Sequence, residues 1–336
     1  MRSSCSCTIS IPGRKCRCPS ATPEDRSILA TFRFRTSPAG VLTPALFLVT
    51  ACVVIAGMGA IAKLLGAQLP AVQIAFLRFA LALPLVVVAN GRTAGLLLVP
   101  PQIGLHLLRG AAAGAALAMA FYAYAHLRLG DATALLFLEP LLVVAIAALA
   151  GRRRLRRSQW AAVGLGLVGA CVILRPGMGA ISIAGLVATM SAAAAAAVAL
   201  LTRRLAAPRV APTLLFHGAL MPALVLVLPA WWVWVPPTPG EWMLITVLAL
   251  AGTGGQWLII AAYRRAAPAV LAPIEYVQLP AAMLLGLAFF DERITGISLI
   301  GVGLIVGAPF LIRPKVPASR AERVAAINLR YKNHSR

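Results

Sequence analysis

Ten apolar runs dominate this chain and constrain its fold more strongly than any other feature of the sequence. Each run has about 20 residues with few or no charges, which is enough to cross about 30 Å of hydrocarbon as a helix. The predicted spans are 43–62, 70–89, 104–125, 132–150, 158–175, 181–202, 211–230, 241–261, 268–290 and 295–313. Because the connections are mostly short, consecutive helices should be antiparallel neighbours. The runs therefore predict an all-α membrane protein with ten transmembrane helices in one compact bundle.

Composition excludes a soluble globular domain. Hydrophobic residues make up 60% of the 336 residues and charged residues 12%, whereas soluble domains have about 45–50% and about 25%. The formal net charge of +22 would suggest a nucleic-acid partner if the basic residues formed a patch on a soluble fold. Here they fall in the tails and between the apolar runs. The expected partner is therefore the lipid bilayer, and no nucleic acid is expected.

Basic residues are distributed unevenly between the two sides of the predicted bundle. With the N-terminus in the cytoplasm, the inner segments hold two basic tails and the stretch GRRRLRRS, while the outer segments hold only Lys63, Arg128, Arg175 and Arg293. An excess of Lys and Arg marks cytoplasmic loops. We therefore expect a multi-pass protein of the cell (inner) membrane with both termini in the cytoplasm. The aromatic stretch WWVWVPPTPGEW at 231–242 would lie at the outer interface.

The N-terminal segment carries two cysteine pairs, Cys5 with Cys7 and Cys16 with Cys18. Their C-x-C spacing differs from the C-x2-C of common zinc sites, and no histidine lies nearby. The segment also has no apolar region of the kind that secretory signals contain. Residues 1–42 are therefore expected to be a disordered basic cytoplasmic tail, or the product of a start codon assigned too far upstream. We expect neither a metal nor a cofactor.

Two glycine-rich stretches, GLGLVG at 164–169 and GVGLIVG at 301–307, lie inside predicted membrane helices. The first matches the dinucleotide-binding pattern G-x-G-x-x-G, but that function requires a preceding strand in a soluble α/β unit. Small residues at these spacings let two helix backbones approach closely. Both stretches therefore predict close helix packing.

An internal repeat relates the two halves of the chain. When 126–142 is set over 262–278, the membrane glutamates Glu139 and Glu275 coincide at an offset of 136 residues, and glycines and prolines further along follow at nearly the same offset. The chain then divides into two five-helix halves, which we place at 43–175 and 176–314, followed by a basic tail at 315–336. Because five is odd, the second half crosses the membrane in the opposite sense. Two inverted five-helix repeats are typical of secondary transporters.

Several motifs carry a resemblance to a known family. They are FLRFALALP in the second run, LGDATALLFLEPLL in the fourth, and IEYVQLPAAMLLGLAFFDERITGISLIGVGLIV near the end. They resemble the EamA branch of the drug/metabolite transporter superfamily over about residues 43–314, and most closely a bacterial group that includes S-adenosylmethionine carriers. The resemblance implies a substrate cavity at the bundle centre. One departure is AGRRRLRR after the fourth run, where the family often has GER, while the second half keeps DERI.

Charged side chains inside the apolar runs are candidate functional residues, because an ionised group in hydrocarbon costs at least a few kcal/mol and needs a partner or a task. Glu139 and Arg78 lie about 10 and 12 Å below the predicted outer surface, so the two could pair. His217 and Glu275 lie about 9 and 10 Å above the predicted inner surface, which suggests a second acid–base pair. We favour Glu275 for proton coupling, because Tyr276 and Gln278 are its neighbours in sequence and an imidazole changes charge near neutral pH.

Two interpretations of these pairs remain open. Each pair either packs a Pro-kinked helix, with the glutamate neutral, or takes part in transport. Polar and aromatic residues in the same runs are the remaining candidates for contacts with an amphipathic solute, although each alone is also typical of helix packing. These residues are Gln73, Tyr122, Tyr124, Gln256, Trp257, Tyr263, Tyr276 and Gln278. The sixth run is rich in alanine and is expected only to pack closely.

The sequence therefore predicts a secondary transporter that moves a small organic metabolite or drug-like solute by alternating access, with proton coupling through Glu139 or Glu275 as the coupling hypothesis. A channel-like or structural membrane protein is the alternative. An intramembrane enzyme is the weakest alternative, since the four histidines are dispersed and form no catalytic motif. The protein is expected to act as a monomer or homodimer.

Overall fold

The computed structural model describes residues 38–90, 102–149, 157–174, 183–205, 211–266 and 268–308. These residues form twelve helices and no strand. The helices of the first half are α2 (Pro38–Leu65), α3 (Ala71–Asn90), α4 (Ile103–His126), α5 (Leu129–Leu136), α6 (Glu139–Leu149) and α7 (Arg157–Leu174). Those of the second half are α8 (Ile183–Leu205), α9 (Ala211–Trp232), α10 (Pro239–Tyr263), α11 (Pro268–Glu275), α12 (Gln278–Phe290) and α13 (Gly296–Gly307).

Some predictions fall on residues outside this description. The four N-terminal cysteines, the arginine-rich stretch 152–156 and the tail after residue 308 belong to this group. At the other boundary, α2 begins at Pro38, a few residues before the predicted end of the N-terminal tail.

Seven helical segments are long and apolar enough to cross a membrane. They are Leu42–Leu65, Ala71–Val88, Ile103–His126, Leu129–Leu149, Ile183–Leu205, Pro239–Tyr263 and Pro273–Phe290. Three shorter apolar helices, Arg157–Ile173, Phe216–Trp232 and Gly296–Gly307, coincide with the remaining predicted runs. An all-helical membrane protein is thus confirmed, while the count of ten spans remains a prediction.

The fourth and ninth predicted runs are not continuous helices. The fourth divides into α5 and α6, and the ninth into α11 and α12. Pro140 and Pro280 explain the breaks, because proline has no N–H to donate to the carbonyl four residues before it. Near the first break the bonding is shortened, with the Leu138 N–H donating to the Leu135 carbonyl at 3.1 Å. At the second, the Leu279 N–H donates to the Tyr276 carbonyl, also at 3.1 Å.

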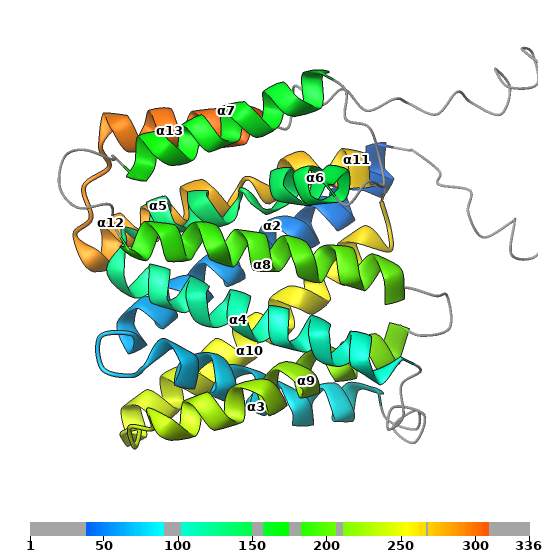
Figure 1. Ribbon diagram of the computed structural model, residues 1–336, viewed down its shortest axis with the longest axis vertical. Helices are drawn as coiled ribbons and strands as arrows, with labels where there is room; N and C mark the ends of the chain where they lie inside the picture. Colours follow the sequence, from blue (N-terminus) through cyan, green and yellow to red (C-terminus); the bar gives the residue numbers. More distant parts are fainter. Residues whose placement is uncertain are drawn as a thin grey trace, which may run out of the picture.

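The helices lie side by side in one bundle, with α7 and α13 along one side and α3 and α9 along the opposite side (Figure 1). We call the end at which α3 and α8 finish and α4 and α9 begin the Asn90 end. The opposite end, at which α2 and α4 finish and α3 and α8 begin, is the Leu65 end. The two ends of the bundle differ in their side-chain contacts.

Polar contacts close the Leu65 end between the two halves of the chain. Lys63 forms an ion pair with Glu292, with 2.9 Å between Nζ and Oε1. The Lys63 ammonium also donates to the backbone carbonyls of Tyr124 and Leu127. The other carboxylate oxygen of Glu292 accepts from the Leu129 N–H at 2.8 Å. Glu292 belongs to the DERI motif, so this motif joins α12–α13 to α2 and α5.

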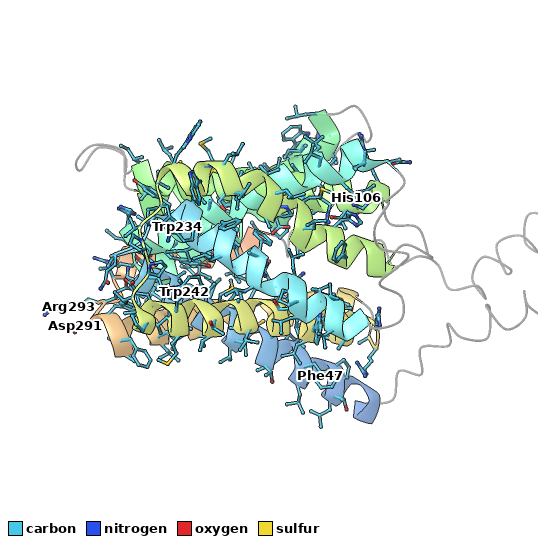
Figure 2. The ribbon with its side chains drawn as sticks, turned by 90° about the horizontal axis from the view of Figure 1, so that it is seen from below. Phe47, His106, Trp234, Trp242, Asp291 and Arg293 are labelled. Carbon is cyan, nitrogen blue, oxygen red and sulfur yellow. The ribbon has the colours of Figure 1, made fainter. Side chains whose placement is uncertain are left out.

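A second contact closes the same end. The Gln73 side chain donates from Nε2 to the Val235 carbonyl at 2.7 Å, and its Oε1 accepts from the Val235 N–H at 2.9 Å. Val235 lies in the aromatic stretch between α9 and α10, and Figure 2 shows Trp234 and Trp242 of that region toward the end where Asp291 and Arg293 lie. One amide side chain thus fixes the α9–α10 connection to α3.

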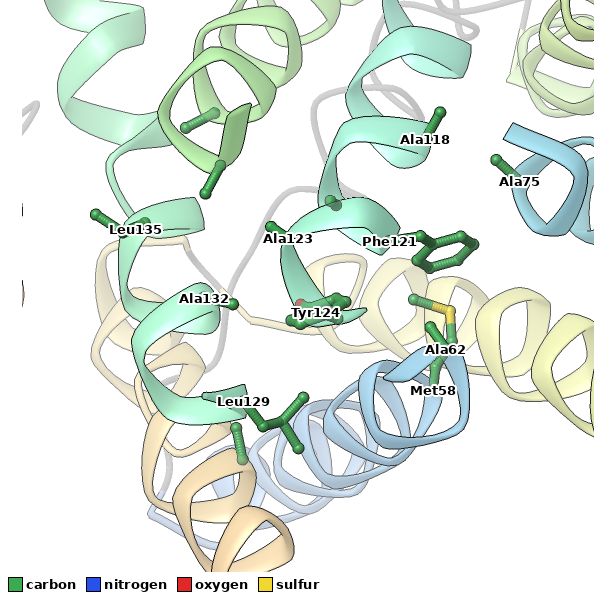
Figure 3. Packing of buried hydrophobic residues seen from close by; sticks show 14 of the residues in the cluster. Met58, Ala62, Ala75, Ala118, Phe121, Ala123, Tyr124, Leu129, Ala132 and Leu135 are labelled. Atoms are coloured by element: carbon green, nitrogen blue, oxygen red, sulfur yellow. The ribbon is translucent and has the colours of Figure 1, made fainter. Parts of the chain in front are cut away.

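Small residues set the spacing of the helices. A Cβ added at Gly169 would lie 2.8 Å from the Gly301 carbonyl oxygen, and one added at Gly301 would lie 2.9 Å from the Gly169 oxygen. These distances confirm that the two glycine-rich stretches allow α7 and α13 to pack closely. In the main core, buried Phe121 of α4 lies near Met58 of α2 (Figure 3).

Candidate substrate-binding site

A cavity of about 670 Å³ lies between α3, α4, α8, α9 and α10, with contributions from α2, α5 and α6. Its volume falls within the range of about 300–1,000 Å³ that is typical of small-molecule sites. The lining residues on α9 and α10 lie between the middle of the bundle and the Asn90 end, and those on α3 and α8 run mostly from the middle toward that end, whereas those on α4 extend past its middle. The wall is mostly alanine and other apolar residues, and its polar members are Arg78, Arg109, Glu139, Ser191, Thr202, Thr253, Gln256 and Trp257.

Arg78 of α3 lies against an apolar surface. A Cβ added at Gly252 of α10 would come within 2.9 Å of Arg78 Nε and 3.0 Å of Nη2, so the absence of a side chain at Gly252 makes room for the guanidinium. The guanidinium carbon also lies 4.7 Å from the centre of the Phe79 ring. Its Nε atom is buried and has no hydrogen-bond partner among the described residues.

Glu139 is the first residue of α6, directly after the helix break. A carboxylate is favourable at a helix N-terminus, where unpaired N–H groups point outward. Arg78 and Glu139 both line the cavity. No ion pair joins them, because the one ion pair found among the described residues is Lys63–Glu292. The predicted pair is therefore not formed in this structure, and the two opposite charges face a shared space instead.

Arg109 of α4 is a cavity residue that the sequence analysis missed. Its Nε donates to the Thr202 hydroxyl of α8 at 2.8 Å. Its guanidinium also lies close to Gly218 of α9, since a Cβ added there would lie 3.3 Å from the guanidinium nitrogens Nη1 and Nη2. A signal was available, because Arg109 is a charge inside the predicted run 104–125, as Glu139 is in its own run.

The prediction of a second acid–base pair, between His217 and Glu275, is wrong. The His217 ring lies 5.1 Å from the His106 ring, between centroids, and the Glu275 carboxylate accepts a hydrogen bond from the Tyr263 hydroxyl at 2.6 Å. The reason is helix arrangement, because α9 packs on α3 and α4, whereas α11 packs on α2 and α10. Equal depth along the bundle does not bring two helices together when they lie on opposite sides (Figure 1).

The two helix breaks meet each other. The ring of Phe137, between α5 and α6, lies 5.3 Å from the ring of Tyr276, between α11 and α12. Glu139 follows the first break and Glu275 precedes the second. The repeated glutamates therefore flank a contact between the two halves, although Glu275 is absent from the cavity lining.

The remaining predicted site residues divide between the cavity and other places. Gln256 and Trp257 of α10 line the cavity. Gln73 lies in the contact that closes the Leu65 end, and Tyr124 is buried in the core. Tyr122 stacks on His126 with 4.1 Å between ring centroids, and Gln278 begins α12.

The alanine-rich sixth run has a larger role than predicted. Its helix α8 supplies Ser191 and Thr202 to the cavity together with a wall of small residues. Small side chains leave space, so an alanine-rich helix can line a cavity as well as pack closely. Within the described residues, no three His, Cys, Asp or Glu side chains cluster as metal ligands would.

An apolar helical bundle around a cavity with a few charged groups has the architecture of a membrane transporter of small solutes. The chain belongs to the EamA-like transporter family, whose sequence model matches residues 42–175 and 182–313. The two matches correspond to two copies of one repeat. This places the chain in the family that its motifs resembled.

Named relatives are transporters from bacteria. A pseudopaline exporter from Pseudomonas aeruginosa is 28% identical over 75% of this chain and 89% of its own length. A riboflavin transporter from Vibrio cholerae is 27% identical over 84% of this chain and 97% of its own. A solved crystal structure superposes with a TM-score of 0.51 at 19% identity, covering 82% of this chain and 96% of that one, which is a likeness of fold. The protein is therefore a multi-pass membrane protein of a transporter family.

Proposed function

We propose that the protein is a secondary carrier that moves a small organic solute across the cell (inner) membrane by alternating access around this cavity. The observation that carries the proposal is the asymmetry of the bundle, which holds the charged cavity toward one end and an ion pair between its halves at the other. The bacterial subgroup with S-adenosylmethionine carriers stays a prediction from the motifs, because the relatives are named for pseudopaline and riboflavin.

Helix packing supports ten spans in two inverted repeats, 43–175 and 176–314. Exchanging the halves replaces α2 with α8, α3 with α9, α4 with α10, and α5–α6 with α11–α12. The packing pairs then map onto each other, since α2 packs on α10 as α8 packs on α4, and α12 packs on α2 as α6 packs on α8. An odd number of spans in each half makes the two copies antiparallel, which is the layout of many secondary transporters.

One difference between the copies supports alternating access. In the first half α4 packs closely on α2 and α3, whereas in the second half α10 does not pack closely on α8 and α9 among the described residues. The cavity lies where that second set of contacts is missing. If the halves exchanged conformations, α10 would close on α8 and α9 while α4 moved away from α2 and α3, and the cavity would open at the Leu65 end.

The distribution of basic residues orients this cycle. Cytoplasmic placement of both termini puts the Asn90 end inside and the Leu65 end outside. The conformation in this structure is then inward-facing, with Lys63 and Glu292 in the closed outer gate. An ion pair suits a gate because it can break and re-form without covalent change.

Proton coupling belongs to the same proposal. Glu139 is the acidic residue among the described cavity-lining residues, so its ionisation can respond to a solute in the cavity. Glu275, favoured from the sequence, is hydrogen-bonded to Tyr263 instead. The position of Glu139 makes it the first candidate, and Glu275 stays the second.

The test is solute counterflow in proteoliposomes. Purified protein is first screened by thermal shift against amino acids, organic acids, nucleosides and flavins, because a ligand that binds the folded state raises its stability. A stabilising compound is then used in labelled form outside vesicles loaded with the same unlabelled compound. A carrier accumulates label transiently above equilibrium. Simple equilibration would indicate the channel-like alternative, and the absence of any stabilising metabolite would contradict the metabolite-carrier proposal.

A further inference from the structure

We propose that the cavity selects organic anions and binds a carboxylate of the solute at Arg78. This inference rests on the proposed function and specifies its substrate class. Among the described lining residues the charged groups are Arg78, Arg109 and Glu139. Two guanidinium groups and one carboxylate leave the wall with a surplus of positive charge.

The described surroundings of the Arg78 guanidinium provide no hydrogen-bond acceptor for its Nε. Its Nε is buried without a hydrogen-bond partner among the described residues, and its surroundings are Gly252, the Met58 sulfur and the Phe79 ring. A buried charge without a partner is costly, and the cost is removed when an opposite charge arrives. A carboxylate matches the planar guanidinium with two parallel hydrogen bonds. The carboxylate of the solute would therefore supply the hydrogen-bond acceptor and the opposite charge that Arg78 lacks among the described residues.

The nearby residues hold Arg78 without neutralising it. Gly252 gives the guanidinium room on α10, and Phe79 offers an aromatic ring that attracts cations. Neither supplies an acceptor oxygen. Glu139 shares the cavity but makes no ion pair with Arg78 among the described contacts.

Arg109 provides a second positive group nearer the Asn90 end. Arg78 lies 12 residues before the end of α3 and Arg109 lies six residues after the start of α4, so the two differ by about 9 Å in depth at 1.5 Å per residue. Arg109 already donates to Thr202. Its charge still attracts an anion entering from this end, and in a cavity of low dielectric that attraction is screened less than at an exposed surface. The alanine-rich wall then accommodates the apolar body of the solute.

The experiment compares three probes of one skeleton on the purified full-length protein. Phenylacetate, phenylacetamide and phenethylammonium differ chiefly in charge, and thermal stabilisation is measured for each at equal ionic strength. Phenylacetate is expected to stabilise the wild type most. Arg78→Met is expected to weaken its binding at least about tenfold, as for loss of a charged hydrogen bond. Arg78→Lys, which keeps the charge but loses the paired geometry, should fall between.

Control variants keep the proposal falsifiable. Arg78→Met removes an unpaired buried charge, so without ligand it should fold and melt at the wild-type temperature or above. Arg264→Met, at an exposed residue outside the cavity lining, should bind phenylacetate as the wild type does. Equal or stronger stabilisation by the amide or the amine, or unchanged phenylacetate binding in Arg78→Met, would overturn the proposal. Anion binding without counterflow would instead contradict the carrier function alone.

Discussion

At the scale of single residues, the three charged groups of the cavity are held in different ways. Arg109 has a hydroxyl partner in Thr202, and Glu139 begins a helix. Arg78 has a glycine and an aromatic ring around it and no acceptor among the described residues. Arg78 is thus the charged group of the cavity that a bound anionic solute would stabilise most.

Adding one methyl group beside Arg78 should disturb substrate binding. In Gly252→Ala the new Cβ would lie 2.9 Å from both Arg78 Nε and the Met58 sulfur, so the guanidinium must move. We expect substrate affinity to fall about tenfold or more while the protein still folds, since the end of an arginine side chain is flexible. Uptake measured against substrate concentration reports the change.

Gly254→Ala is the matched control, because nothing lies within 4 Å of a Cβ at that position. It makes the same substitution on the same helix and should transport normally. Equal losses in the two variants would indicate an effect on α10 as a whole and not on Arg78.

Neutralising the cavity carboxylate should uncouple transport from the proton gradient. Glutamine resembles glutamate in shape but cannot take up or release a proton, so Glu139→Gln is expected to abolish uphill transport driven by a pH gradient. Glu275→Gln, whose wild-type carboxylate accepts from Tyr263, is expected to keep it. Flux with and without the gradient distinguishes the variants. The opposite result would return the coupling role to Glu275, and a wild type indifferent to the gradient would remove coupling altogether.

At the scale of elements, helix breaks and glycine contacts decide how the bundle packs. The breaks at Pro140 and Pro280 bring Phe137 and Tyr276 together at 5.3 Å between the halves. Glycines elsewhere replace side-chain contacts with backbone contacts, as between α7 and α13. Such contacts leave no room for larger residues.

Filling the α7–α13 contact should therefore destabilise the protein. In Gly169→Val the first added carbon alone would lie 2.8 Å from the Gly301 oxygen and 2.9 Å from side-chain atoms of Leu304 and Ile305. Overpacking of this kind costs about 1–3 kcal/mol, so the melting temperature in detergent should fall. Gly164→Val, on the same helix with nothing within 4 Å of its Cβ, should melt close to the wild type. An unchanged Gly169→Val would mean that α7 and α13 are not packed as described.

At the scale of the whole molecule, the packing between the two halves is nearly symmetric, as α2 on α10 matches α8 on α4. In contrast, α4 packs closely on α2 and α3, whereas α10 does not pack closely on α8 and α9 among the described residues. The cavity lies toward the Asn90 end, and the Lys63–Glu292 pair closes the Leu65 end. The alternating access that we propose requires this pair to separate in every cycle.

A covalent bond in place of the ion pair should stop transport. Cysteines at positions 63 and 292, in a background in which the native cysteines are replaced by serine or alanine, are expected to be cross-linked by a short bifunctional reagent. Cross-linking should abolish counterflow while substrate binding from the Asn90 end persists. With a cleavable reagent, reduction should restore activity. Each single-cysteine variant treated identically is the control. Full activity in the cross-linked protein would show that the Leu65 end need not open.

The sequence by itself determined the class of fold and the family. Apolar runs specify membrane helices because hydrocarbon cannot solvate backbone groups, so length and hydropathy are sufficient to predict them. The glycine-rich stretches likewise predicted close packing, which Gly169 and Gly301 confirm. The charge in each run identified Glu139 and Arg78 as unusual, and both line the cavity.

Only the tertiary structure decided which of these residues meet. Depth along a helix is encoded locally, but which helix lies beside which depends on packing between segments more than a hundred residues apart. His217 and Glu275 share a predicted depth and yet have other neighbours, His106 and Tyr263. Arg109 enters the cavity because α4, α8 and α9 converge around it. A single sequence carries no signal for such a convergence, because it arises from the combined shapes of several helices.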